Sequence, residues 1–160
     1  MSKGSFKDTN IREVVSTIRE HGLNVIANYI FGLPDDDMQS MQRTLELALE
    51  LNTEMVNMWP CQALPGSPLY YLAKANGWAL PDSFDGYAFL SYASQPLPTK
   101  HCTAAEVLRF RDAAWNAYFS NPAFLDLIER KFGAAQRQNV EAMSRIKLHR
   151  KLLGDPPPQA

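Results

Sequence analysis

Two short apolar segments joined by a helical pattern constrain the fold of this chain more than any other feature. Residues 23–31 and 54–59 are rich in β-branched, aromatic and other apolar side chains, as strands are. Between them, apolar residues recur at helical spacing: Met38, Met41, Leu45, Ala48 and Leu49. A strand, a helix and a second strand in this order predict two parallel strands with a right-handed crossover. The continuous apolar character predicts that both faces of the strands are covered.

The predicted sheet has too few strands to be complete. Parallel strands are stable when several lie side by side between covering layers. These two are too apolar to serve as exposed sheet edges. We therefore expect neighbouring strands, which would come from a preceding portion of a longer protein, from a second copy of the chain, or from strands that the sequence pattern does not reveal. The first source suits the sequence best, for the reasons that follow.

Helices dominate the rest of the chain. An apolar stripe from Ile11 to Ile18 predicts an opening helix that ends at Gly22, and Ser67 and Pro68 begin a short helix that ends at Gly77. After an irregular segment rich in proline and aromatic residues, helices are predicted from 103, from 122 to 132 and from 135 to 153. The chain thus divides into residues 1–77 with the strands, the irregular segment 78–102, the helical extension 103–153 and a disordered tail, 154–160.

The composition argues against several classes of protein. A net charge of -1 gives no overall field that would attract nucleic acid or an anionic membrane. The basic residues of the last helices are expected on a solvated face: Lys131, Arg137, Arg145, Lys147, Arg150 and Lys151. No apolar stretch approaches the roughly 18 residues of a membrane span, and residues 1–9 lack a signal-peptide core, so we expect a cytoplasmic protein. Cys61 and Cys102, far apart, and three scattered histidines predict no metal site.

The first predicted strand and the loop after it carry a motif. Its residues are Asn28, Ile30, Gly32, Leu33, Pro34 and Asp35. Spaced in this way, they resemble the Gly-x-Ile-x-Gly-x-x-Glu pattern at the fifth strand of radical S-adenosylmethionine (SAM) barrels, which is often written through Gly-Leu-Pro. Asn28 stands in place of the first glycine and Asp35 in place of the glutamate. Residues 62–70, which follow the second predicted strand, resemble the sixth-strand end of the same enzymes, where a Pro-Gly-Thr/Ser-Pro-Leu run is frequent.

The resemblance covers the chain from about Phe6 to about Leu153 and includes residues 6–10 and 97–111. It is to the cobalamin (B12)-binding subgroup, which includes proteins similar to the anaerobic magnesium-protoporphyrin IX monomethyl ester oxidative cyclase. The implied fold is α/β: the last strands and helices of a partial TIM-type (βα)6 barrel, then a mostly helical C-terminal region. By resemblance, Ile30 would pack against the adenine of SAM and Asp35 would order the loop. The implied cofactor-binding residues are Asn28, Ile30, Gly32, Leu33, Pro34, Asp35, Gln62, Leu64 and Pro65.

The chain departs from this family at the iron–sulfur cluster. The family holds a 4Fe–4S cluster through a Cys-x-x-x-Cys-x-x-Cys loop, since thiolates are the required ligands, and this sequence has no such triplet. The resemblance therefore implies a fragment that shapes part of the SAM site but binds no SAM, cluster or cobalamin alone. A missing N-terminal radical SAM and cobalamin-binding portion would be its partner. The implied reaction is reductive cleavage of SAM to a 5′-deoxyadenosyl radical, then methyl transfer or ring formation on a small molecule. Whether cobalamin assists is left open.

Two other functions remain open at this stage. The chain could be a stand-alone interaction module, derived from such an enzyme, that forms a homodimer through its exposed strands. A helical nucleic-acid binder is a weaker alternative. Strand alternation would turn some of Asn57, Trp59 and Gln62 inward, where contact with a ligand and a purely structural role are equally favoured. The aromatic residues between Trp78 and Tyr92 are expected mainly to cover the core.

Overall fold

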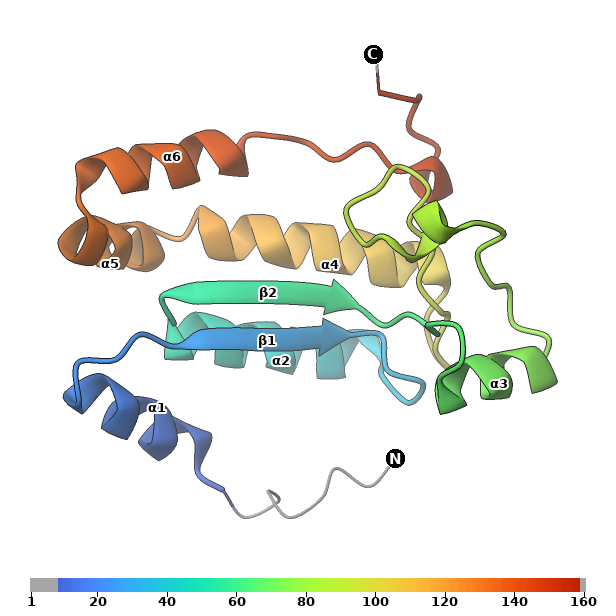
Figure 1. The fold of residues 1–160 in the computed structure, drawn as a ribbon, viewed down its shortest axis with the longest axis horizontal. Coiled ribbons are helices and arrows are strands. Elements are labelled where there is room, and N and C mark those ends of the chain that lie inside the picture. Colours follow the sequence, from blue (N-terminus) through green and yellow to red (C-terminus); the bar gives the residue numbers. More distant parts are fainter. Residues whose placement is uncertain (1–8, 159–160) are drawn as a thin grey trace.

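A computed structural model describes residues 9–158 as two parallel strands with six α-helices, mostly helical after the strands (Figure 1). The elements are α1 (Ile11–Glu20), β1 (Ile26–Phe31), α2 (Met38–Leu51), β2 (Met55–Pro60), α3 (Pro68–Ala75), α4 (Ala104–Phe119), α5 (Pro122–Phe132) and α6 (Ala134–Ser144), with 3-10 turns at Phe84–Tyr87 and Lys151–Leu153. The resemblance at residues 6–8 lies outside the described part. No helix described between residues 9 and 158 has the length and apolarity needed to cross a membrane.

The sheet consists of β1 and β2, paired in parallel with Ile26 beside Met55 and Phe31 beside Pro60. Helix α2 provides the crossover between them, as the sequence predicted. Asn52, in a left-handed conformation, ends this helix and turns the chain into β2. Because residues 9–158 contain no further strand, the described part of the chain holds no hidden strands that complete the sheet.

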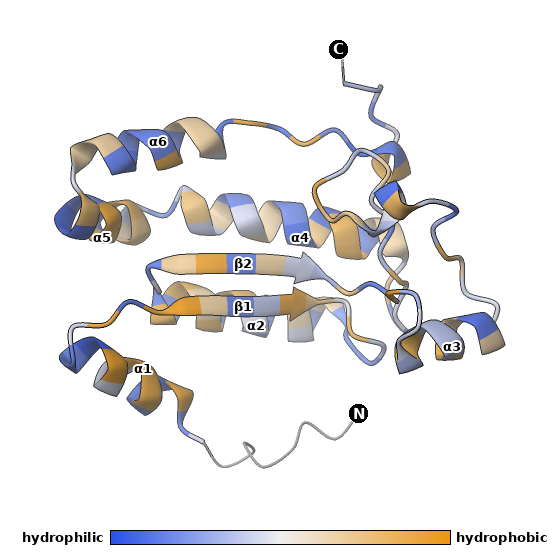
Figure 2. Ribbon diagram, in the orientation of Figure 1, coloured by the Kyte–Doolittle hydropathy of each residue, from blue (hydrophilic) through white to orange (hydrophobic). Residues whose placement is uncertain are grey.

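The core lies on one face of this sheet. Tyr29 and Phe31 of β1 and Met58 of β2 are buried against α2 and α4, together with Met41 and Val107. The opposite side chains of both strands are exposed. Figure 2 shows both strands as apolar along most of their length, with a hydrophilic position midway. The predicted coverage of both faces is therefore wrong for the described residues, because the helices that pack on the strands lie on one side (Figure 1).

The two edges of the sheet differ. Met55 N–H donates to the Val25 carbonyl at 3.2 Å and Cys61 N–H to the Phe31 carbonyl at 2.7 Å, so odd-numbered residues of β1 face β2. The backbone groups of residues 26, 28 and 30 point to the other edge, where no strand of residues 9–158 pairs with them. The outer edge of β2 is capped near its carboxyl end, because Arg111 Nε donates to the Met58 carbonyl at 2.8 Å and Pro60 has no N–H. The sheet is thus open to extension at β1.

A buried carboxylate, Glu54, joins several elements at the amino ends of the strands. Its side chain accepts hydrogen bonds from Lys131 of α5 at 2.7 Å, from Arg19 of α1 at 3.3 Å and from the Val25 N–H at 2.9 Å. Burial alone would raise the pKa of Glu54, but these donors outweigh it and lower the pKa to about 2. Glu54 therefore stays ionised and fixes α1, α5 and the start of β1 around the start of β2.

The C-terminal part departs from the sequence expectation. Helix α6 ends at Ser144, not near residue 153, and the chain then runs without helix to Arg150. Arg150 was expected in solvent but is fully buried: it makes two 2.8 Å hydrogen bonds to Asp112 and donates to the carbonyls of Phe89 and Ser91. Because α6 ends at Ser144, the chain can extend to the point where Arg150 reaches these partners. Within the segment predicted as a disordered tail, Asp155 accepts from the Arg150 N–H at 3.0 Å.

Replacement of Glu54 tests the buried carboxylate. Because the folded-state pKa is lowered from 4.5 to about 2, the ionised group stabilises the fold above pH 4.5, and this contribution is lost as the pH falls to about 2. Glu54→Gln is expected to lower the free energy of unfolding at pH 7 by about 3 kcal/mol, with the gap to wild type closing near pH 2. Urea titrations across this pH range measure it.

The matched control is Glu50→Gln, which removes an ion pair to Arg12 between two exposed side chains. This variant is expected to unfold almost as the wild type does, because exposed pairs are screened by water. Equal effects of the two substitutions, or a Glu54→Gln deficit that does not change with pH, would contradict the role given to Glu54.

Candidate functional site

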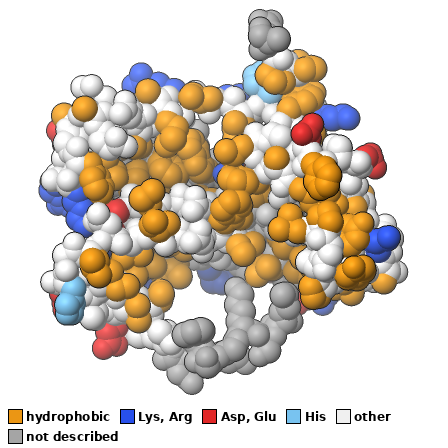
Figure 3. Space-filling view, viewed as in Figure 1, with side chains coloured by type: hydrophobic (Ala, Val, Ile, Leu, Met, Phe, Trp, Pro, Cys, Tyr) orange, Lys and Arg blue, Asp and Glu red, His pale blue; other side chains and the backbone are white. Residues whose placement is uncertain are grey.

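The uncovered face of the sheet is the first component of the candidate site, and we call it the open face. It consists of Ile26, Asn28 and Ile30 from β1 and Met55, Asn57 and Trp59 from β2. Ile30 and Trp59, neighbours in register near the carboxyl ends of the strands, are 45% and 36% exposed. Figure 3 shows hydrophobic side chains gathered on the side of the molecule that bears these strands. Four of its six side chains are apolar and exposed, which makes this face a candidate binding surface.

Three polar groups are bonded to one another in the middle of the open face. Asn28 Oδ1 accepts from Asn57 Nδ2 at 3.0 Å and, more weakly, from Trp59 Nε1 at 3.4 Å. Alternation thus turns Asn57 and Trp59 to the same side as Asn28. Gln62 points elsewhere, because its Nε2 donates to the Gly86 carbonyl of the irregular segment at 3.1 Å. Gln62 therefore tethers that segment.

The loop after β1 depends on Gly32. This residue has a φ of 81°, and a Cβ added to it would lie 2.4 Å from Val107 Cγ1 of α4. Asp36 orders the loop: its Oδ2 accepts from the N–H groups of Gly32 at 3.1 Å and Leu33 at 2.9 Å. The residue after Asp35 thus supplies the side-chain contacts that order this turn. Asp35 itself is largely exposed and forms an ion pair with Lys100.

A returning segment crosses the carboxyl ends of both strands. The Leu97 N–H donates to the Cys61 carbonyl, directly after β2, and the Lys100 N–H donates to the Pro34 carbonyl, each at 3.0 Å. Cys61 is buried, and this burial, with the nearby negative charge of Asp36, raises the pKa of its thiol to about 11. The thiol stays protonated near neutral pH, so Cys61 has a packing role and is a poor nucleophile.

The predicted site residues fall into two groups. Asn28 and Ile30 lie on the open face, and Gly32, Leu33 and Pro34 form the loop directly beyond them. The others lie farther along the chain or point away: Asp35, Gln62, Leu64 and Pro65. Leu64 is 54% exposed and lies four residues after the end of β2. The structure thus brings the β1 half of the predicted set together at one strand end.

An aromatic wall supported by buried charge completes this end of the open face. The aromatic residues between Trp78 and Tyr92 were expected mainly to cover the core, and one of them, Phe89, packs on Trp59 instead. The rings of Trp59 and Phe89 have centroids 4.2 Å apart, and the Arg111 guanidinium lies 5.3 Å from the Phe89 centroid. Asp112 binds both Arg111 and Arg150 at 2.8 Å. The burial of Arg150 has no local sequence signal, because it arises from contacts with residues distant in the chain.

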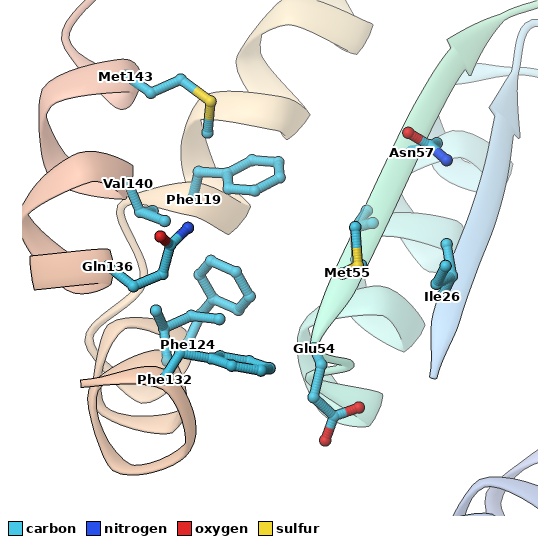
Figure 4. Close-up of a pocket in the computed structure, with 12 residues that line it drawn as sticks. Ile26, Glu54, Met55, Asn57, Phe119, Phe124, Phe132, Gln136, Val140 and Met143 are labelled. Carbon is cyan, nitrogen blue, oxygen red and sulfur yellow. The ribbon is translucent and has the colours of Figure 1, made fainter. Parts of the chain in front are cut away.

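A separate cavity of about 380 Å³ lies at the amino ends of the strands, between β2 and the last helices (Figure 4). Its lining is mainly apolar: Ile26, Met55, Val56, Phe119, Phe124, Ile128, Phe132, Val140 and Met143, with Glu54, Asn57 and Gln136 as polar members. Ile26, Met55 and Asn57 belong to the open face, so the cavity continues that face away from the Gly32 loop.

The described residues do not fit a metal cofactor. Between residues 9 and 158, no three His, Cys, Asp or Glu side chains are grouped to hold a metal ion. Cys61 and Cys102 are both buried as free thiols. A 4Fe–4S cluster needs several converging thiolates, so these residues do not form its binding site.

Comparison with known proteins gives one distant similarity. The chain is 22% identical over 113 residues to an uncharacterized methyltransferase of Pyrococcus horikoshii. The match covers 71% of this chain but 24% of that protein, so the chain spans about a quarter of its relative. No protein-family model matches the sequence, and no solved structure matches it. The similarity is therefore to a methyltransferase, at a distance.

Substitution of Gly32 tests the loop geometry. Gly32→Ala is expected to lower the free energy of unfolding by about 3 kcal/mol, because alanine adds both an unfavourable positive φ and a clash with Val107. Gly22→Ala is the control: Gly22 has a φ of 75° with open space around it, so only the conformational cost of about 1–2 kcal/mol applies. Thermal unfolding measures both, and equal losses would show that α4 does not press on this loop.

Proposed function

We propose that these residues form the closing strands of a larger SAM-dependent methyltransferase of the radical SAM barrel type, and that the carboxyl end of the open face contacts the adenosyl group of SAM. The observation that carries this proposal is the one-sided burial of a parallel sheet. Helices cover one face of β1 and β2, and the other face presents Ile30 and Trp59 to a ligand or to further protein.

The unpaired edge of β1 supports the barrel part of the proposal. The backbone groups of residues 26, 28 and 30 suit a further parallel strand, whereas the carboxyl end of the β2 edge is capped by Arg111 and Pro60. Strands added at β1 would continue a curved sheet with α2 and α4 outside and the open face inside. This is the arrangement of the last two strands in a partial TIM-type (βα)6 barrel. The preceding portion of the protein would supply the added strands.

The position of Ile30 supports the adenosyl contact. Ligands of parallel α/β folds bind at the carboxyl ends of the strands, and Ile30 lies there with its side chain on the open face. The Gly32 turn after it has no side chain that would keep a nucleoside away. We propose that the binding surface consists of Asn28, Ile30, Gly32, Leu33 and Pro34. Of the other residues that the resemblance implied, Gln62 would act through the segment that it tethers, and Asp35, Leu64 and Pro65 would lie at the border of this surface.

This chain has a limited part in the chemistry. SAM supplies the transferable methyl group, and the residues described here would bind the nucleoside and keep water from it. A 4Fe–4S cluster does not fit the residues of this chain, so in a radical SAM protein its ligands would come from another portion. The distant similarity to a methyltransferase supports methyl transfer as the class of reaction.

Photolabelling of the intact gene product that contains these residues tests the proposal. The probe is SAM with an azide on its adenine ring, followed by trypsin digestion. Label is expected in peptide 20–43, which carries Ile30 and Gly32, and an excess of unmodified SAM should suppress it. Ile30→Glu is expected to reduce labelling about tenfold, because it places a charge where an apolar ring binds.

Ile146→Glu provides the control, since Ile146 is an exposed isoleucine after α6 and outside the open face. It should leave labelling unchanged. Label found only outside residues 20–74, or labelling insensitive to Ile30→Glu, would refute the adenosyl contact.

The free β1 edge could also pair with the β1 edge of a second copy of the chain. This homodimer is what the alternative function, a stand-alone interaction module, would require. Light scattering separates the two proposals. A homodimer that dissociates when Asn28→Pro removes an edge N–H would favour the module, whereas a monomeric gene product would favour the barrel.

A further inference from the structure

We propose that a cleft between α4 and the chain after α6 binds a phosphorylated small molecule that carries an apolar ring. The cleft has a volume of about 530 Å³, and the segment that leaves α6 forms one of its walls (Figure 1). Residues of α4 line one side, and residues 144–148 with Leu153 and Asp155 line the other. The proposed function makes no use of this cleft, so the two proposals are independent.

Helix α4 separates this cleft from the sheet. Val107 and Tyr118 of α4 are buried in the core against the strands. Arg109 and Ala113 line the cleft, and their place in the helical repeat puts them on the opposite face of α4. The cleft and the open face are therefore separate sites.

Positive charge exceeds negative charge in the cleft. Four cationic side chains line it: Arg109, Arg111, Arg145 and Lys147. Two carboxylates also line it, so the cleft has an excess of two positive charges in a chain whose net charge is -1. Both carboxylates are already engaged. Asp112 accepts three hydrogen bonds of 2.8 Å from Arg111 and Arg150, and Asp155 accepts from the Arg150 N–H at 3.0 Å and from Lys147 at 3.3 Å.

Three arginines keep hydrogen-bond donors for a ligand. Arg109 and Arg145 are exposed, and neither forms an ion pair with any residue between 9 and 158. Arg111 is only 2% exposed: its Nε donates to the Met58 carbonyl and its Nη1 to Asp112, but its Nη2 has no hydrogen-bond partner in the same part of the chain. Like charges that line one cavity repel one another until an anion joins them. Because a guanidinium presents a planar pair of donors, the arrangement matches a phosphate group.

The remaining lining suits an apolar ring beside the phosphate. Trp115, Leu148 and Leu153 contribute apolar surface, and Trp115 is braced by Phe119, with the ring centroids 4.7 Å apart. A phosphate monoester carries close to two negative charges and balances the excess in the cleft, whereas a carboxylate would balance half of it. The absence of an overall positive field in the chain favours a small molecule over a polyanion.

Two aromatic anions of similar shape test the charge of the ligand in the intact gene product. At about pH 8, phenyl phosphate carries two negative charges and phenyl sulfate carries one. Ligand-detected NMR titrations should show about tenfold tighter binding of phenyl phosphate than of phenyl sulfate. Inorganic phosphate, which lacks the ring, should also bind more weakly. Arg109→Gln and Arg145→Gln should each weaken phenyl phosphate binding about tenfold, since each removes a charge-assisted hydrogen bond.

Arg130→Gln is the matched control. Arg130 is an exposed arginine of α5 that likewise has no ion pair among residues 9–158, and it lies outside the cleft. This substitution should leave phenyl phosphate binding unchanged. None of the three substitutions should change the temperature of thermal unfolding, because none removes an ion pair of the fold. A loss of binding at full stability therefore assigns Arg109 and Arg145 to the ligand.

Three results would overturn the proposal. The first is equal affinity for phenyl phosphate and phenyl sulfate, and the second is phenyl phosphate binding that neither Arg109→Gln nor Arg145→Gln weakens. The third is binding of short single-stranded DNA that depends on the same two arginines and falls steeply with salt, which would assign the cleft to a nucleic acid.

Discussion

The structure depends on a parallel sheet that is buried on one face only. Helices α2 and α4 cover the inner side chains of β1 and β2, and this packing forms the main core. The same packing leaves Ile30, Asn28 and Trp59 on the other face, without a covering layer from residues 9–158. A two-stranded parallel sheet is marginal alone. The open face and the free edge of β1 therefore have a common origin: both are places where a larger sheet would continue.

Buried charges support the two ends of this sheet in different ways. At the amino ends, Glu54 connects α1, α5 and β1, and it lies away from the candidate site. At the carboxyl ends, Asp112 holds Arg111 and Arg150 behind the aromatic wall of Phe89 and Trp59. The first arrangement stabilises the fold, and the second positions a surface that a ligand can reach. This division matches parallel α/β folds, where stability resides at the amino ends and binding at the carboxyl ends.

Local sequence patterns predicted most of the elements but not the long-range contacts. Apolar spacing located both strands and α2, and the cap residues Ser67 and Thr103 marked the starts of α3 and α4. The burial of Arg150 and the hub at Glu54 were not predictable, because each depends on partners far away in the chain. Coverage of both sheet faces was predicted from the apolar character of the strands. An apolar side chain indicates that it is buried against something, but not whether the covering residues belong to the same segment of chain. The partner of Ile30 is not within the described residues.

The central claim of the proposed function is that these strands complete a larger parallel sheet, of which the chain holds two strands. Amide hydrogen exchange at residues 26, 28 and 30 tests this most directly, in the intact gene product and in the 160-residue chain alone. The account predicts slow exchange in the intact protein, where a neighbouring strand accepts these N–H groups, and fast exchange in the chain alone. Equally fast exchange in both would show that the β1 edge has no strand beside it, and would contradict the account.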